Sequence, residues 1–164
     1  MNSLIKEIKT KAKSQKVKVY FDMDGTLAGF YDVENWLDYL LKEKIKPYRV
    51  AKPLVNMRQL GKEIRRLQSL GYSVGIISWG SKDARDTYIQ KIRRAKLNWL
   101  YEHLGSVTFD HVSIVPYGTP KSTLGHGILF DDEERNRDEW NAAGAENKAY
   151  GVDNIIGILK TIIT

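Results

Sequence analysis

The sequence predicts an α/β fold with a mostly parallel sheet, because short apolar runs alternate along the chain with segments of helical periodicity. Strands that are joined through helices connect by right-handed crossovers, which leave them parallel to one another. The chain has 164 residues, enough for one domain with a substantial core and too few for two full domains. We therefore expect a single domain that spans residues 1–164.

The first predicted strand covers residues 17–21 and is followed at once by two acids. Val17, Val19 and Phe21 favour a strand of a largely buried sheet. Asp22 and Asp24 come next, and the glycine after them lets the chain turn away. An Asp-rich turn that only caps the strand is the structural alternative. The apolar strand before the two acids favours carboxylates presented for chemistry at a strand end.

The remaining elements follow from the same two periodicities. Helical spacing of apolar residues predicts helices over residues 33–45, 53–71, 82–104, 138–143 and 154–162. Apolar runs predict further strands over residues 73–78, 109–115, 127–130 and 148–151. Lys46 and Pro47 are expected to end the first of these helices, and Pro53 is expected in the first turn of the second.

The composition is that of a globular protein, with 42% hydrophobic and 28% charged residues. Apolar runs stay well short of the length that spans a membrane. The lysine-rich N-terminus lacks the apolar core of a signal peptide, so we expect a cytoplasmic location. The chain contains no cysteine, which excludes disulfides, thiolate catalysis and Cys-based zinc sites. A metal ion would therefore be held by oxygen or histidine.

Charge is distributed unevenly along the chain. Residues 1–100 carry 21 Lys and Arg against 10 Asp and Glu, whereas residues 101–164 carry 5 against 10. The basic first part suits an anionic partner, which is either a phosphorylated small molecule or a nucleic acid. Six lysines between residues 6 and 18 contribute to the excess, and a solvated N-terminal helix is the better explanation of that run.

Polar side chains follow three of the predicted strands, and the carboxyl ends of parallel strands meet at one edge of a sheet. They are Asp22 and Asp24 after the first strand, Ser78 after the second, Asp131 and Asp132 after the strand at 127–130, and Lys121 in the loop before that strand. Each has a structural alternative: an ordinary strand-end serine, a surface lysine, and acids that cap the next helix. Their placement at one edge favours a shared site.

Acids gathered without a histidine cluster favour a hard cation bound by oxygen, and Mg²⁺ is expected where phosphate is a co-ligand. Asp22 is predicted to attack phosphorus while one of its oxygens binds the ion. Asp24 is predicted to protonate the leaving alcohol and later to activate water. Ser78 and Lys121, together with backbone N–H groups of the turn after Asp22, are predicted to bind the phosphoryl oxygens.

These residues resemble the four motifs of the haloacid dehalogenase superfamily of aspartate-nucleophile phosphatases, in the same order and over nearly the whole chain. The resemblance implies a three-layer Rossmann-like fold with a small helical cap inserted after the first strand, at about residues 28–52. It favours Asp132 over Asp131 as a metal ligand, and Asn136 departs from it because many members carry a further acid there. The expected metal ligands are Asp22, Asp24, Asp131 and Asp132, and the expected phosphate-binding residues are Ser78, Lys121, Met23 and Trp79.

Within the superfamily the chain is most similar to the 5'(3')-deoxyribonucleotidases and their bacterial and phage relatives, through residues 22–30, 99–105 and 121–132. This similarity implies a Mg²⁺-dependent phosphomonoesterase that forms an aspartyl phosphate and acts on nucleoside or deoxynucleoside monophosphates. Phe30, Trp36 and Tyr48 lie in the expected cap, where they either stack on a base or form the cap's own core. Two alternatives stay open: a phosphatase that processes 3'-phosphorylated nucleic-acid ends, and a non-catalytic nucleotide binder.

Overall fold

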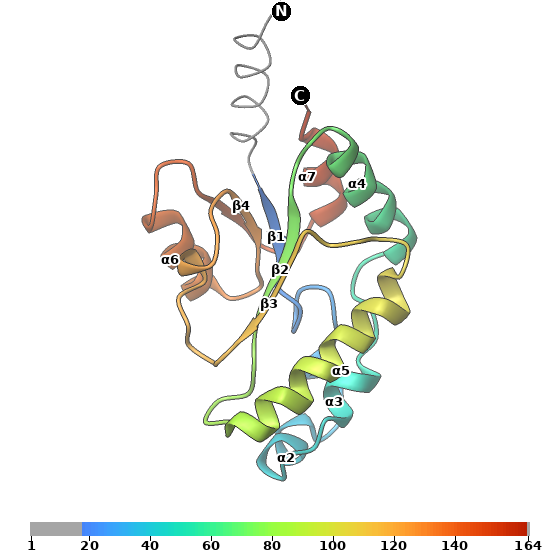
Figure 1. The fold of residues 1–164 in the computed structure, drawn as a ribbon, viewed down its shortest axis with the longest axis vertical. Coiled ribbons are helices and arrows are strands. Elements are labelled where there is room, and N and C mark those ends of the chain that lie inside the picture. Colours follow the sequence, from blue (N-terminus) through green and yellow to red (C-terminus); the bar gives the residue numbers. More distant parts are fainter. Residues whose placement is uncertain (1–17, 164) are drawn as a thin grey trace, which may run out of the picture.

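The computed structural model describes residues 18–163, and a five-stranded sheet runs through its centre (Figure 1). All neighbouring strands pair in parallel, and their order is β3-β2-β1-β4-β5. The strands are β1 (Val19–Phe21), β2 (Val74–Trp79), β3 (His111–Val115), β4 (Ile128–Phe130) and β5 (Lys148–Tyr150). The predicted α/β class with its parallel sheet is confirmed.

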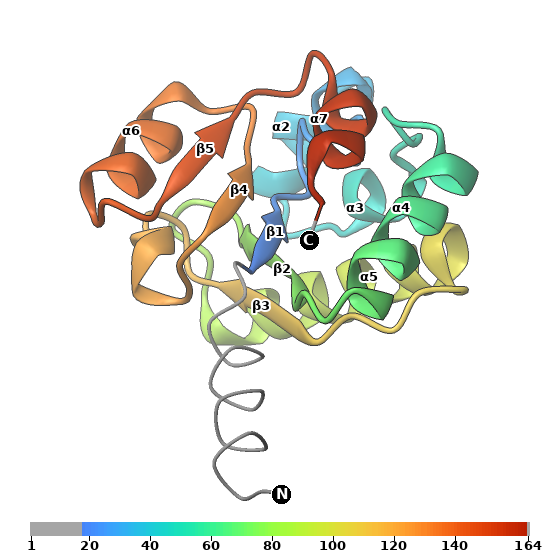
Figure 2. The same cartoon turned by 90° about the horizontal axis from the view of Figure 1, so that it is seen from above.

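Helices cover both faces of the sheet, because alternate strand residues point to opposite sides. One face packs against α4 (Met57–Ser69), the C-terminal part of α5 (Asp86–Leu104) and α7 (Ile155–Thr161). The other face packs against α6 (Glu134–Ala142), where the rings of Tyr20 and Trp140 meet edge to face at 5.8 Å. Figure 2 shows the resulting three layers, with α6 on one side of the strands and the other three helices on the opposite side.

The segment between β1 and α4 holds a short 3₁₀ helix, η1 (Phe30–Asp32), and the helices α2 (Trp36–Leu41) and α3 (Lys46–Val50). These elements pack against the N-terminal half of α5 through a separate apolar cluster that contains Phe30, Tyr48 and Ile92. Hydrogen bonds add to this contact, since Tyr88 donates to the carbonyl of Lys44 at 2.7 Å. Helix α5 therefore connects the inserted segment to the layered core.

The prediction of one helix over residues 33–45 is wrong. Asn35 and Glu43 adopt left-handed backbone conformations, with φ of 58° and 52°, which confine α2 to six residues between them. Pro47 lies in the first turn of α3, so it begins a helix where the sequence led us to expect an end.

Three other helix boundaries differ from the prediction. Helix α4 begins at Met57 and not near Pro53, because the side chain of Asn56 caps it by accepting from the N–H of Gln59. Helix α5 begins at Asp86, after a left-handed residue at Asp83 (φ 57°). Helix α6 begins four residues before the predicted position 138. The expected lysine-rich N-terminal helix and Val17 lie outside the described residues. Within residues 18–163, no helix has the length and apolar character needed to cross a membrane.

The strand order determines where a ligand site forms. From β1 the chain adds β2 and β3 on one side, and later β4 and β5 on the other. The carboxyl ends of β1 and β4 thus border the point where the direction of strand addition reverses, and in open parallel sheets ligands bind at that point. Asp22 follows β1, and Asp131 and Asp132 follow β4.

Candidate active site

Asp22 is held at the end of β1 by both its backbone and its side chain. Its N–H donates to the carbonyl of Phe130 at 2.9 Å, which continues the pairing of β1 with β4. Its Oδ1 lies 2.9 Å from Nζ of Lys121, and its Oδ2 accepts from the hydroxyl of Thr26 at 3.4 Å. Hydrogen bonds also fix the turn that carries Thr26, because the N–H groups of residues 26, 27 and 28 all donate to the carbonyl of Met23. The nucleophile predicted from the sequence is therefore a buried and rigidly placed carboxylate.

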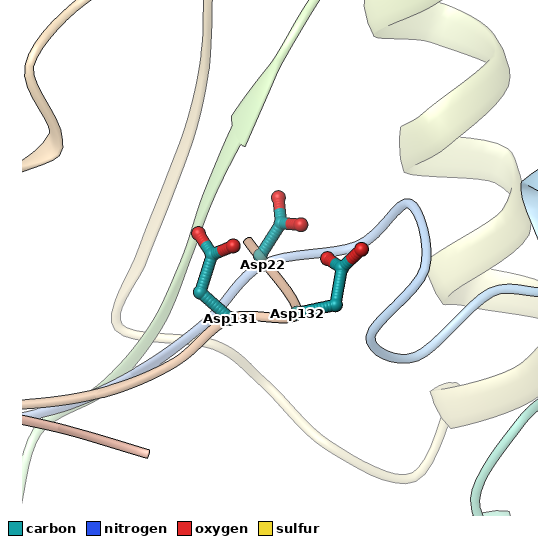
Figure 3. Close-up of side chains that lie close together, drawn as sticks. All are labelled: Asp22, Asp131 and Asp132. Atoms are coloured by element: carbon teal, nitrogen blue, oxygen red, sulfur yellow. The ribbon is translucent and has the colours of Figure 1, made fainter. Parts of the chain in front are cut away.

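Three carboxylates converge in front of β1 and β4 (Figure 3). Asp22, Asp131 and Asp132 each offer an oxygen within 4.8 Å of the others. Lys121 Nζ contacts Asp131 at 2.6 Å as well as Asp22, and Nδ2 of Asn136 donates to Asp131 at 3.2 Å. The sequence resemblance marked Asn136 as a departure, because a further acid is common at that position. In this chain the amide of Asn136 instead donates to a carboxylate of the cluster.

This oxygen-rich cluster fits a divalent cation. Burial, followed by the negative charge of Asp22, raises the pKa of Asp131 to about 6 and the pKa of Asp132 to about 7. Together with Asp24, the site has four carboxylates but only two buried ammonium groups, those of Lys121 and Lys96. This leaves an excess of negative charge for a cation to neutralise. The donor set is the one that Mg²⁺ prefers, and Asp22, Asp131 and Asp132 are the residues that would hold it.

The close approach of the first turn to this cluster depends on Gly25. Its backbone is left-handed, with φ of 79°. A Cβ atom at this position would collide with the carboxylate of Asp132. Gly25 is therefore needed both for the turn and for the space that Asp132 occupies.

Asp24 lies apart from the three clustered carboxylates. Its Oδ2 is 2.7 Å from Nζ of Lys96, a residue of α5 that the sequence analysis did not select. Burial raises the pKa of the Asp24 carboxyl, and the ammonium group of Lys96 opposes this rise. Asp24 was expected to serve as acid/base and also as metal ligand, and its side chain faces the lysine instead of the cluster.

The phosphate-binding residues expected from the sequence lie on β2, in the turn after β1 and in the short helix before β4. Ser78 is fully buried near the end of β2, and its Oγ lies 2.7 Å from Nζ of Lys96. Lys121 begins a short 3₁₀ helix, η2 (Lys121–Thr123). Burial alone lowers the pKa of the Lys121 ammonium group, but the carboxylates beside it outweigh burial and raise the pKa overall. Met23 is buried directly after Asp22.

The side chain of Trp79 forms part of a wall. Its indole N–H donates to the carbonyl of Thr119 at 2.8 Å, and its ring lies 4.9 Å from the ring of Tyr117. Nζ of Lys121 lies 5.4 Å from the centre of the indole ring. The indole is thus held in place by the loop before η2, beside the buried ammonium group of Lys121.

A cavity of about 440 Å³ opens between this wall and the inserted segment. Asp22, Asp24 and Lys121 line its inner end, and aromatic and leucine side chains line the remainder. Phe30 is buried with its ring 5.5 Å from Trp36 and 4.7 Å from Tyr48, so these three rings form a packed cluster and also border the cavity. This arrangement is compatible with both roles expected for these rings, stacking on a base and forming the cap's own core.

Comparison with known proteins gives a structural match without a sequence match. No protein-family model matches the chain, and no curated protein sequence does. The D,D-heptose 1,7-bisphosphate phosphatase from B. bronchiseptica, solved in complex with magnesium and phosphate, superposes with a TM-score of 0.52. The match covers 87% of this chain and 96% of that protein at 13% identity. The fold is of the haloacid dehalogenase type. At this identity the similarity establishes the fold and leaves the nucleotidase relationship a prediction.

Within this fold, the residues expected to form the site lie at or near the carboxyl ends of neighbouring strands. The first motif follows the central strand β1, Ser78 lies on its neighbour β2, and Asp131 and Asp132 follow its other neighbour β4. Lys121 reaches the same place from η2, where it contacts both Asp22 and Asp131. The structure therefore brings together residues that are separated by up to 110 positions in the chain.

One signal could have identified Lys96 from the sequence. Ile92 and Leu100 lie four positions before and after it, and both are buried on the apolar side of α5. A lysine at the centre of an apolar helical stripe is rare unless its charge is paired, because burying an unpaired charge is costly. The apolar periodicity that predicts the buried face of α5 does not include a lysine, so this pattern alone does not select Lys96.

Proposed function

We propose that the protein is a Mg²⁺-dependent phosphomonoesterase that forms an aspartyl phosphate on Asp22. The observation that carries this proposal is the environment of the Asp22 carboxylate, which is buried at a strand end, paired with Lys121 and open to the cavity. A carboxylate used only to stabilise the fold has no need of a cavity in front of it. The heptose bisphosphate phosphatase with the same fold was solved with magnesium and phosphate, which supports the same chemistry here.

The residues divide the reaction between them. An oxygen of Asp22 attacks phosphorus, so that the O–P bond forms as the bond from phosphorus to the leaving oxygen breaks. Asp24 gives its proton to that oxygen, then takes a proton from the water that cleaves the aspartyl phosphate and restores Asp22. Lys121 and the Ser78 hydroxyl bind phosphoryl oxygens. When bound, Mg²⁺ supplies positive charge that offsets the repulsion between an anionic nucleophile and an anionic phosphate.

We infer that the preferred substrates are nucleoside or deoxynucleoside monophosphates. Two pairs of aromatic rings line the cavity, Trp79 with Tyr117 and Tyr31 with Trp36. An aromatic base can stack there while the phosphate reaches Asp22, and each stacking contact is worth about 1 to 3 kcal/mol. In this proposal residues 28–52 act as a small cap that covers the substrate.

Phosphate release from a panel of nucleotides, sugar phosphates and phosphorylated oligonucleotides, with Mg²⁺ and with EDTA, tests the proposal. We expect turnover of nucleoside monophosphates that requires Mg²⁺. Asp22→Asn should reduce kcat on the order of 10⁴-fold or more, because the nucleophile is lost. The matched control is Asp138→Asn, at an exposed acid of α6, which should retain full activity. Undiminished turnover by Asp22→Asn, or no phosphate release from any substrate, would contradict the aspartyl-phosphate proposal.

A nucleic-acid end-processing phosphatase is the second candidate, and the charge of the inserted segment favours it. Lys42, Lys44, Lys46 and Arg49 are all exposed on or beside α2 and α3. Such a surface attracts a phosphate backbone and gives binding that weakens steeply with salt. Faster turnover of a 3'-phosphorylated oligonucleotide than of mononucleotides, with strong salt dependence, would select this candidate. A non-catalytic nucleotide binder would bind the same ligands without releasing phosphate.

A further inference from the structure

Lys96 is enclosed at the back of the candidate active site. Only 1% of its side chain is exposed, and its Nζ lies 2.7 Å from each of three oxygens. These are Oδ2 of Asp24, Oγ of Ser78 and the carbonyl oxygen of Trp79. The ring of Tyr48 covers the ammonium group, with its centre 5.2 Å away. One lysine thus joins the end of β2 to the turn after β1.

The hydrogen-bonding capacity of this lysine is fully used. An ammonium group has three donors and no acceptor, and three oxygens occupy those donors. Lys96 therefore has no donor left for a substrate oxygen in this arrangement. Any influence on the reaction must act through the groups that Lys96 holds.

The donor-only character of Lys96 determines which atoms of two of those groups stay available for other partners. Oγ of Ser78 accepts from Lys96, so the hydroxyl hydrogen of Ser78 stays available for another acceptor. Oδ2 of Asp24 accepts from Lys96, which leaves Oδ1 as the oxygen that can exchange a proton with a substrate. Asp24 borders the cavity, so Oδ1 belongs to a carboxylate that a substrate can reach.

We infer that Lys96 is a positioning residue for phosphoryl transfer, which fixes the Asp24 carboxylate for proton transfer and turns the Ser78 hydroxyl toward the phosphoryl group. This inference rests on the proposed function, because it gives both residues their roles in that reaction. Pairing a buried charge is the alternative role of Lys96. A residue that only stabilised the fold would affect all phosphate esters equally, whereas a residue that positions the proton donor must affect most those esters whose leaving group needs a proton.

Two esters of similar size separate these roles. The leaving group of p-nitrobenzyl phosphate is an alkoxide that needs a proton, whereas p-nitrophenyl phosphate releases a stable phenolate. With Mg²⁺ present, we expect Lys96→Met to lower kcat/KM on the order of 10²-fold for the benzyl ester and less than about tenfold for the phenyl ester. Lys91→Met, at an exposed lysine of the same helix, is the matched control and should change neither.

A double-mutant cycle shows whether Lys96 acts through Asp24. In the Asp24→Asn background the proton donor is already lost, so adding Lys96→Met should cost no more on the benzyl ester than it does on the phenyl ester, which is less than about tenfold. Equal losses of Lys96→Met on both esters, or full additivity with Asp24→Asn, would overturn the positioning role. If Lys96→Met is unfolded in a thermal scan, Lys96→Gln, a neutral amide with two donors in place of three, replaces it, and the benzyl ester should again lose more than the phenyl ester.

Binding of inorganic phosphate gives a readout that does not depend on turnover. In the presence of Mg²⁺, calorimetry should show about tenfold weaker phosphate binding for Lys96→Met, with little further loss when Ser78→Ala is added. If the wild-type protein hydrolyses neither ester while this binding pattern holds, the proposed phosphatase function fails and the orientation of Ser78 by Lys96 stands. Unchanged phosphate affinity in Lys96→Met would overturn the inference even in an active enzyme.

Discussion

Lys121 and Lys96 neutralise different parts of the site. Lys121 lies between two carboxylates of the three-acid cluster, whereas Lys96 pairs with Asp24 outside it. Asp132 contacts neither of these ammonium groups, and its Oδ1 accepts from the hydroxyl of Thr26. Asp132 is therefore the acid of the cluster that neither ammonium group neutralises, and its pKa rises to about 7, above that of Asp131. This is where a bound cation would change the electrostatics most.

Gly25→Ala should damage the site more than its backbone strain predicts. Gly25 and Gly118 both have left-handed backbones, with φ of 79° and 86°, so alanine at either position costs about 1 to 2 kcal/mol. Alanine at position 25 must also displace the carboxylate of Asp132, whereas no atom lies within 4 Å of a Cβ at position 118. We expect Gly25→Ala to lower kcat/KM at least tenfold and to weaken the thermal shift caused by Mg²⁺. Gly118→Ala is the control for strain and should leave both unchanged, and equal effects of the two substitutions would contradict the argument.

The elements of the fold were predictable where one local rule decides them. Buried strands followed by polar turns were located correctly, because an apolar run between turn residues has few other outcomes. The helix boundaries were not, since they depend on single backbone conformations. Asn35 and Glu43 have left-handed φ values that nothing in the residues around them predicts. Helix α4 begins after the cap residue Asn56, although Pro53 is the stronger helix-start signal in the sequence.

The candidate site was predictable to the extent that it lies at strand ends. Asp22, Ser78 and Asp131 were found because a parallel sheet brings such positions together. Lys96 comes from the middle of a helix, and its position relative to Asp24 depends on how α5 packs against the sheet. Sequence spacing indicates that Lys96 is buried but does not indicate which carboxylate it meets.

The inserted segment should control which esters bind. Trp36→Ala removes a ring from the cavity wall, and we expect KM for nucleoside monophosphates to rise about tenfold, which corresponds to about 1.4 kcal/mol of lost stacking. The affinity for inorganic phosphate should stay the same, because the phosphate site that we propose lies at Asp22 and Lys121 and does not include Trp36. Tyr101→Ala, at an exposed aromatic residue of α5 that does not line this cavity, is the control. Equal weakening of phosphate and nucleotide binding by Trp36→Ala would show that the ring only supports the fold.

At the scale of the whole molecule, topology concentrates negative charge in a basic protein. The chain has a net charge of +6, yet the reversal of strand order places four carboxylates at one edge of the sheet. Three of the acids that gather there, Asp24, Asp131 and Asp132, have raised pKa values because burial and like charge disfavour their ionised forms. The stability of the molecule is therefore coupled to whatever neutralises this edge, either protons or a divalent cation.

This coupling predicts a pH-dependent effect of Mg²⁺ on stability. The folded protein without metal binds protons at Asp131 and Asp132 up to pH values of about 6 and about 7, whereas these acids ionise near pH 4 in the unfolded chain. Their contribution to the stability of the metal-free protein therefore rises as the pH falls from about 8 toward about 5. Mg²⁺ binds ionised carboxylates, so it should raise the Tm most above about pH 7 and progressively less below about pH 6. Thermal unfolding in EDTA and in Mg²⁺ across this range measures the difference.

Asp132→Asn supplies the decisive comparison for this prediction. The amide keeps an acceptor for the hydroxyl of Thr26 but removes the charge, so the metal-free variant should be more stable than the wild type above about pH 7. The same variant should lose most of the stabilisation by Mg²⁺, because one of the three clustered carboxylates is gone. Asp153→Asn, at an exposed acid after β5, should follow the wild type at every pH. An increase in Tm with Mg²⁺ that is independent of pH, or that survives in Asp132→Asn, would mean that the cation binds elsewhere than at this edge of the sheet.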